Sequence, residues 1–477
     1  MIPVLLIVIP LVTGLLSFFI KEERSAKALA LFSSVITLIV SLMSLSQTGR
    51  SISFDTAWLP MLGSRFSVSL DGMGKVLTLL TAVSFPLIFA STYRNYYRSS
   101  NAFYGFMLLT QAGLMGVFAA MDLFVFYFFW ELALIPAYFL CSKWGGEKRI
   151  AVTFKFFVYT FAGSLLMLVG ILYVFYKTPE HSFAISSLRN LSFGKGEGNF
   201  IFWLFFIAFA IKMPVFPFHT WQPDTYEQAP TAVTMVLSGI MVKMGVFAVI
   251  RWLLPMLPAA SVRMADLVMI LAVIGMIYAS LIAIRQDDMK RLVAYSSIAH
   301  IGLMAASMFA GSASGMQGVI FQMFAHGVNI IGLWIVIDVI EQQLGTRKFS
   351  ELGGLAQTAP TLAVMFVVMS FANIALPLTN SFVGEFLMFN SVFRYSPALG
   401  AVACISIILA AVYTLWMVQK VFYGDVRREA AIALKVPAGT QLTLVILVAV
   451  VLILGVYPQP MIDLGSETVS KIIAQIK

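Results

Sequence analysis

The sequence predicts an all-α protein that crosses a membrane about fourteen times. Hydrophobic residues make up 60% of the 477-residue chain, charged residues only 11%, and the mean hydropathy is +0.92. Apolar runs of about 20 residues, the length of a transmembrane helix, recur along the whole chain. This composition excludes a soluble domain. The formal net charge of +9 is typical of membrane proteins with basic cytoplasmic loops, so it does not indicate a nucleic-acid partner.

The apolar runs define fourteen candidate spans in chain order. They cover residues 2–20, 27–46, 73–92, 102–120, 122–142, 151–176, 200–219, 229–252, 264–285, 290–310, 313–341, 359–391, 397–422 and 439–458. Between the second and third spans, residues 50–72 alternate polar and apolar residues, which predicts a small hairpin outside the membrane. Residues 424–438 predict a short surface helix before the last span.

Basic residues in the connections predict the orientation. The connections after odd-numbered spans carry sixteen lysines and arginines, and those after even-numbered spans carry eight. Because basic residues accumulate in cytoplasmic loops, the odd-numbered connections are expected to be cytoplasmic. With fourteen spans, both termini then lie outside a bacterial inner membrane.

Two of the spans are predicted to be broken inside the membrane. The seventh breaks at Lys212-Met213-Pro214 and the twelfth near Leu376-Pro377, because a proline removes an N–H and frees a carbonyl. Spans 4–8 and 9–13, taken as two units, each have the broken helix in fourth place. Five spans per unit make the second unit inverted relative to the first. Two unrelated proline kinks are the alternative.

These units divide the chain into four parts. Residues 1–101 hold the first three spans and the hairpin. Residues 102–252 form the first repeat and residues 253–423 the second. Residues 424–477 hold the surface helix, the last span and the C-terminal tail.

Four ionisable residues fall near the middle of predicted spans: Glu131, Lys212, Lys243 and Glu385. A lysine at the centre of a membrane helix costs roughly 2.5–3.5 kcal/mol, so such residues indicate function. Lys212 ends its half-helix, where the helix dipole favours a cation. A buried lysine beside a carboxylate can change between ion-paired and neutral states, as a proton relay requires. A static ion pair that fixes helix packing is the alternative.

Three histidines and one shallower lysine extend this set. His300 and His326 lie inside spans ten and eleven, His219 ends span seven, and Lys155 lies in span six. A histidine can carry protons on its two ring nitrogens. Each histidine could instead be satisfied by a neighbouring carbonyl, and Lys155 could form a static ion pair.

Other polar residues of the spans have structural interpretations. Asp266 and Asp338 lie near span ends and are expected to be solvated. Asn329, Asn373 and Asn380 are expected to join neighbouring helices by hydrogen bonds.

No cofactor or metal site is expected on this chain. The two cysteines, Cys141 and Cys404, lie in separate apolar runs, and the sequence has no CxxC, HxxxH or HExxH motif. No glycine-rich loop follows a strand pattern, so no nucleotide site is expected.

Seven short stretches in and between spans five and twelve form a specific pattern. They are Trp130-Glu131, Lys155-Phe156-Phe157, Phe218-His219-Thr220-Trp221-Gln222-Pro223-Asp224, Glu227-Gln228-Ala229-Pro230-Thr231-Ala232, Lys243-Met244-Gly245, Lys290-Arg291-Leu292-Val293-Ala294-Tyr295-Ser296-Ser297-Ile298-Ala299-His300 and Phe382-Val383-Gly384-Glu385-Phe386. Together they resemble the antiporter-like membrane subunits of respiratory complex I. Glu385, where the sister L and N types tend to have lysine, favours the M-type branch, which matches mitochondrial subunit 4. The end of the chain soon after span fourteen favours it too.

The resemblance implies two half-channels joined by a polar axis of proton-relay residues. It implies that Glu131 and Lys212 are a modulating pair and that Lys243 is the central relay. It further implies that His300 and His326 lie on the axis, that Glu385 serves the outward half-channel, and that Lys155 and His219 belong to the relay.

The implied function is that of a proton-translocating subunit of NADH:quinone oxidoreductase, driven by quinone reduction on other chains. Flavin, iron–sulfur clusters and quinone would then be held by partner subunits, and this chain would carry no redox chemistry. The implied partners are the L- and N-type sister subunits, and through them the peripheral redox arm. A subunit of a multi-chain sodium/proton antiporter, the ion pump of a membrane-bound hydrogenase, and a stand-alone solute transporter are the alternatives.

Overall fold

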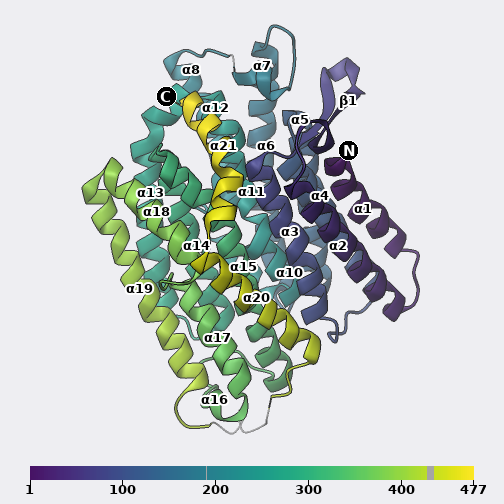
Figure 1. Cartoon of the computed structure of the whole chain (residues 1–477), viewed down its shortest axis with the longest axis vertical. Helices are drawn as coiled ribbons and strands as arrows, with labels where there is room; N and C mark the ends of the chain where they lie inside the picture. The colour runs from purple at the N-terminus through teal and green to yellow at the C-terminus, as the bar shows by residue number, and fades with distance from the viewer. Residues whose placement is uncertain (190, 427–433, 477) are drawn as a thin grey trace.

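The fourteen apolar segments form helices in the computed structural model, which describes residues 1–189, 191–426 and 434–476 (Figure 1). Eleven of the described helical segments are long and apolar enough to cross a membrane. The predicted membrane bundle is therefore confirmed, whereas the number fourteen stays a prediction.

The N-terminal part contains three long helices and the predicted hairpin. Its helices are α1 (Ile2–Ser17), α2 (Glu23–Leu45) and α3 (Gly72–Ser91). Strands β1 (Ser53–Leu59) and β2 (Ser64–Ser69) pair antiparallel between α2 and α3, with Ser53 opposite Ser69. Short η1 (Gly49–Ile52) and η2 (Pro60–Leu62) flank β1. The β-hairpin is confirmed, and its position outside the membrane stays a prediction.

The first predicted repeat begins with three continuous helices. They are α4 (Ser100–Ala119), α5 (Leu123–Trp144) and α6 (Arg149–Lys177). After short α7 (Ile185–Arg189) comes the broken seventh span, α8 (Lys195–Lys212) followed by α9 (Trp221–Gln228). Helix α8 ends at Lys212, as predicted, and the N–H of Val215 donates to the carbonyl of Ala210.

The eighth span is a continuous helix with two π-helical segments. It contains α10 (Thr231–Val236), η3 (Leu237–Met241), α11 (Lys243–Ala248), η4 (Val249–Leu253) and α12 (Leu254–Met256). In η3 the N–H of Val242 donates to the carbonyl of Leu237, five residues back, at 3.2 Å. Such insertions often mark functional sites, and the apolar pattern gave no sign of them.

The second predicted repeat has the same order of elements. It contains α13 (Pro258–Ile284), α14 (Met289–Phe309), α15 (Ala313–Leu344), short α16 (Leu355–Thr358), the broken pair α17 (Pro360–Asn373) and α18 (Asn380–Tyr395), and α19 (Pro397–Phe422). Within the break, Ala375 and Leu378 have positive φ angles of 54° and 75°. Equivalent pairs touch in both halves: α4 packs on α5 as α13 packs on α14, and α6 contacts both α8 and α9 as α15 contacts both α17 and α18.

The C-terminal helices α20 (Ala438–Val456) and α21 (Gln459–Ile476) lie across the front of the bundle in Figure 1. Both chain ends, the hairpin and α7 lie at the upper end of this view, and α16 lies at the opposite end. The surface helix predicted within 424–438 falls largely on residues 427–433, which are outside the described residues.

Candidate functional site

Lys243 and His326 make a buried contact in the interior of the bundle. Lys243 Nζ lies 2.8 Å from His326 Nδ1 and donates at 2.8 Å to the carbonyl of Ser238 in η3. Their exposed fractions are 0% and 2%. An ammonium can only donate, so His326 Nδ1 must accept while Lys243 is charged. The ring proton of His326 then resides on Nε2, and Nδ1 is the nitrogen that is able to take a proton from Lys243.

His300 and Glu385 make a second contact of the same kind. His300 Nδ1 on α14 lies 2.8 Å from Glu385 Oε1 on α18, and both side chains are buried. Gln322 on α15 donates its Nε2–H to the same oxygen at 3.2 Å. An ionised Glu385 only accepts, so His300 carries its proton on Nδ1 in that state.

The two pairs face one another through their imidazole rings. The ring centroids of His300 and His326 are 5.5 Å apart. The Nε2 atoms of both are buried, and neither has a hydrogen-bond partner among the described residues. Buried ring nitrogens are normally satisfied by water when no protein partner exists. A cavity of about 20 Å³ borders His300 and Glu385, which is room for one water molecule.

Lys212 is buried and Glu131 is half-buried, and the two do not form an ion pair. Lys212 Nζ has no hydrogen-bond partner within the described part of the chain and lies 5.5 Å from the centroid of the Trp130 ring. Glu131 follows Trp130 on α5, and its Oε1 is also buried and unpartnered within the same residues. No contact of 4 Å or less joins their charged groups. The cation–π contact stabilises Lys212 where it stands.

Lys155 and His219 lie apart from the line of contacts. Lys155 Nζ donates to Asp224 Oδ2 and to the carbonyl of Thr220, both at 2.9 Å. His219 is 3% exposed, and its ring centroid lies 5.3 Å from that of Tyr278. The structure therefore places Lys155 in an ion pair and His219 in an aromatic environment.

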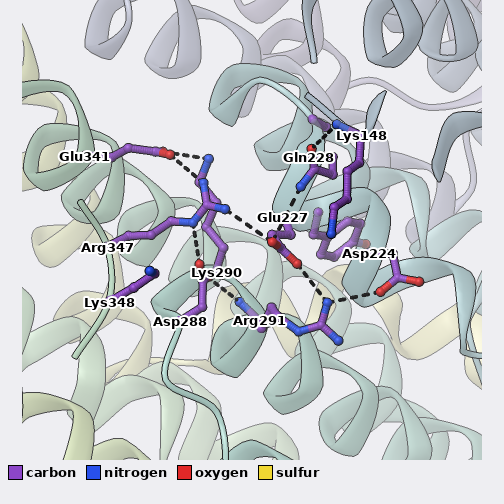
Figure 2. Close-up of polar contacts among 12 residues, drawn as sticks. Lys148, Asp224, Glu227, Gln228, Asp288, Lys290, Arg291, Glu341, Arg347 and Lys348 are labelled. Carbon is purple, nitrogen blue, oxygen red and sulfur yellow. Dashed lines mark hydrogen bonds and ion pairs between the residues drawn. The ribbon is translucent and has the colours of Figure 1, made fainter. Parts of the chain in front are cut away.

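A charged cluster covers the end of the bundle from which α15 leads into α16 (Figure 2). Arg347 bonds to Asp288 and Glu341, and Arg291 bonds to Glu227 at 2.8 Å and to Asp224 at 3.0 Å. Burial alone would lower the pKa of Arg347, but Asp288 and Glu341 together raise that pKa, so Arg347 stays charged.

Lys290 completes the cluster and lines a cavity beside it. Its Nζ pairs with Glu341 at 2.7 Å. The cavity has a volume of about 640 Å³ and borders the connections α3–α4, α5–α6 and α9–α10 as well as α15. Asp338 also lines it. The expectation that Asp338 is solvated is wrong: its side chain is 5% exposed, because Asn95 from the α3–α4 connection packs over it and donates to Oδ2 at 3.1 Å.

The in-span asparagines behave as expected. Asn329 Nδ2 on α15 donates to Asn380 Oδ1 at 3.0 Å and to Ser381 Oγ at 2.8 Å, both at the start of α18. Asn373 Nδ2 donates to Thr414 Oγ1 at 3.4 Å on α19. These contacts join neighbouring helices.

Comparisons with known proteins agree in one family. Residues 120–410 match the family model described as NADH:quinone oxidoreductase/Mrp antiporter, TM. The chain is 36% identical to NADH-quinone oxidoreductase subunit M of Rhodobacter capsulatus, over 94% of this chain and 91% of that protein. It is 34% identical to F(420)H(2) dehydrogenase subunit M of Methanosarcina mazei, over 97% of both chains. A chain of respiratory complex I from Thermus thermophilus matches its structure with a TM-score of 0.91 and 29% identity, over 99% of this chain and 100% of that chain.

Proposed function

Because the chain belongs to the family of membrane subunits shared by NADH:quinone oxidoreductases and Mrp antiporters, we propose that it is the M-type proton-translocating subunit of a respiratory NADH:quinone oxidoreductase. The observation that carries this proposal is the row of buried titratable groups Lys243, His326, His300 and Glu385 in the interior of the bundle. Buried ionisable groups of membrane proteins are costly and are typical of proton pathways.

The proton moves along this row in single transfers. Lys243 gives a proton to His326 Nδ1 and becomes a neutral amine. His326 then releases its Nε2 proton to a water molecule, which passes a proton to His300 Nε2. His300 gives its Nδ1 proton to Glu385, and Glu385 releases one to the outward half-channel. Each ring takes a proton on one nitrogen and loses another from the second, so both return to the neutral state.

Lys212 and Glu131 regulate this transfer electrostatically. Their charged groups lack partners among the described residues and are not in contact, so either can change its charge without breaking a strong bond. Moving one proton against about 180 mV needs roughly 4 kcal/mol. A change of charge at Lys212 alters the energy of a proton on Lys243, since both lysines are buried at 0–1% exposure.

Lys155 and His219 serve the cytoplasmic side of the relay. Lys155 holds Asp224 and the α8–α9 connection in place through its two hydrogen bonds, and His219 lies in this connection. The four parts 1–101, 102–252, 253–423 and 424–477 then act as an N-terminal support, two inverted repeats and a C-terminal brace. The equivalent helix contacts of the two halves support the repeat.

The complete complex also contains redox groups and partner subunits. Flavin, iron–sulfur clusters and quinone are held by other chains, and this chain contributes no redox chemistry. L- and N-type sister subunits adjoin it in the bacterial inner membrane. The excess of basic residues in odd-numbered connections favours a cytoplasmic position for the charged cluster and an outside position for both termini. Both termini lie at the same end of the bundle, opposite α16, which supports an even number of spans.

A different electron donor is the second candidate. The relative from Methanosarcina mazei is named an F(420)H(2) dehydrogenase subunit and is as similar as those named for NADH. Purification of the complex through a tag on this chain tests both. We expect sister subunits and a redox arm to copurify and NADH to reduce quinone. Reduction by reduced coenzyme F420 alone would favour the second candidate, and copurification with antiporter subunits alone would contradict both.

A further inference from the structure

Asp338 is a buried carboxylate that has no part in the relay from Lys243 to Glu385. It lies near the end of α15 at the wall of the 640 Å³ cavity, and it is 5% exposed. Oδ2 accepts one hydrogen bond from Asn95, while Oδ1 is buried and has no partner among the described residues. A carboxylate in such a place is costly unless it takes up a proton or a water.

The neighbouring cations are already paired with other carboxylates. Lys290 and Arg347 both bond to Glu341, one turn further along α15. No cation lies within 4 Å of Asp338 in the part of the chain that the structure describes. The titratable and charged groups around Asp338 and its cavity are Tyr96, Tyr97, Arg98, Glu147, Lys148, Glu227, Lys290, Glu341 and Arg347. Asp338 is therefore free to change its charge without breaking an ion pair.

Hydroxyl groups lead from the same cavity towards Lys243. Thr231 lines the cavity, and Thr234 and Ser238 come after it at spacings of three and four residues, which places the three on one face of a helix. All three are buried. Ser238 Oγ donates to the carbonyl of Thr234 at 2.7 Å, and Lys243 Nζ donates to the carbonyl of Ser238 at 2.8 Å.

The π-helical segment η3 brings Lys243 onto this face. In a regular α-helix each residue turns about 100°, so Lys243 would lie about a third of a turn away from Thr231. A π segment absorbs one extra residue and turns the rest of the helix back by about 100°. Lys243 then lies within about 20° of Thr231, which agrees with its contact to Ser238.

Two antiparallel elements therefore connect the same two points. Thr231 and Asp338 line the cavity together, and twelve residues along each helix, towards the interior, Lys243 and His326 touch at 2.8 Å. Helices α10 and α15 are in contact, as are η3 and α15. We propose that Asp338 collects protons from the cytoplasmic cavity and delivers them to Lys243 along Thr231, Thr234 and Ser238.

The transfer, which rests on the proposed function, balances one proton per cycle. Water in the cavity protonates Asp338, and Asp338 loses that proton to the hydroxyl row and its waters. The hydroxyls of Thr234 and Ser238 donate to backbone carbonyls, which cannot relay a proton, so water molecules carry the proton between the hydroxyls, each of which accepts one proton as it passes on its own. Lys243 accepts the proton only when it is a neutral amine, which is the state left after transfer to His326. Uptake from the cavity thus comes after transfer along the axis.

The test compares variants of the intact complex in inside-out membrane vesicles, with NADH-driven proton uptake as the readout. Asp338→Asn keeps the shape and the contact to Asn95 but cannot ionise, so we expect uptake to fall as far as in Lys243→Ala. Asp338→Glu should retain part of the uptake and shift its pH profile. Glu147→Gln is the matched control, because Glu147 is an exposed carboxylate that lines the same cavity; parental uptake is expected.

Parental uptake in Asp338→Asn, together with a loss in Lys243→Ala, would overturn the proposal for Asp338 and leave the proposed function intact. Parental uptake in Lys243→Ala would overturn the proposed function itself. Should Asp338→Asn fail to assemble, Thr231→Val and Thr231→Ser decide the question. Uptake lost in Val and kept in Ser supports the hydroxyl path, and equal parental uptake in both overturns it.

Discussion

Lys243 Nζ and His326 Nδ1 are 2.8 Å apart although 83 residues separate them in the chain. The contact forms because η3 turns Lys243 towards α15, where small residues let the helices approach. A Cβ at Gly239 would lie 2.9 Å from the Ile331 side chain, and one at Gly327 would lie 2.8 Å from the carbonyl of Gly239. Substituting either glycine would therefore separate the donor from the acceptor.

The Lys243→Arg substitution distinguishes a role of Lys243 as a positive charge from a role in proton transfer. A guanidinium keeps the positive charge but does not lose its proton in proteins. We expect the complex to assemble and NADH-driven proton uptake to fall as strongly as in Lys243→Ala. Uptake close to the parental rate in Lys243→Arg would show that Lys243 acts only through its charge.

Lys212→Met removes a buried cation and keeps much of the side-chain volume. A lysine at the centre of a membrane helix costs roughly 2.5–3.5 kcal/mol, so we expect the variant complex to be at least as heat-stable as the parent. Proton uptake should nevertheless fall, because Glu131 would no longer have the charged Lys212 as its partner in regulating the proton transfer. Lys155→Met is a useful comparison, since Lys155 is ion-paired with Asp224. Equal heat stability with undiminished uptake in Lys212→Met would contradict a regulatory role.

Asn329→Leu tests the joint between α15 and α18. The side chain is 2% exposed and donates to both Asn380 and Ser381. Loss of these bonds leaves Asn380 Oδ1 with less support, and interhelical bonds in membranes are worth about 0.6–2 kcal/mol. We expect a lower dissociation temperature for Asn329→Leu than for Asn373→Leu, whose bond to Thr414 is long at 3.4 Å. The reverse order would contradict this.

Asp71, just before α3, predicts a pH dependence of stability. Burial alone would raise the pKa of Asp71, but the Arg251 guanidinium and bonds from Gly74 and Thr468 lower it overall. A lowered folded-state pKa stabilises the fold above the unfolded pKa of about 3.9, and this contribution is lost as the pH falls through the folded pKa. We expect thermal stability of the complex to decline below about pH 4.

Asp71→Asn should remove this part of the pH dependence. It should also lower stability near neutral pH by about 3–5 kcal/mol, because Arg251 would keep a buried charge without its partner. Thr468 lies on α21, so amide exchange in α21 should become faster in the variant. A decline of unchanged size in Asp71→Asn would assign the acid sensitivity to other carboxylates.

Some of this site could be predicted from the sequence because its causes are local. Pro214 and Pro377 lie beside the two helix breaks, and the charges of Lys212, Lys243 and Glu385 stand out inside apolar runs. The alternation of residues 50–72 likewise indicated the hairpin.

Other features depend on contacts between distant segments. The burial of Asp338 depends on Asn95, 243 residues away, and the ion pair of Lys155 depends on Asp224 in the broken span. The π segment before Lys243 changes the hydrogen-bond register by one residue, which leaves no mark on composition. The contact of Lys212 with the Trp130 ring, rather than with Glu131, also joins segments far apart in the chain, so the sequence could not show it.

The most direct test of the relay is proton uptake in three variants of Glu385, measured in vesicles with NADH and normalised to electron flow. Glu385→Gln keeps the shape but cannot ionise, so uptake should fall strongly while assembly holds. Glu385→Asp should retain part of the activity, because water can bridge one missing methylene. Glu385→Lys can still carry a proton and should retain more than Gln. Near-parental uptake in all three variants would mean that Glu385 is structural and would contradict a relay from Lys243 through the histidines to this residue.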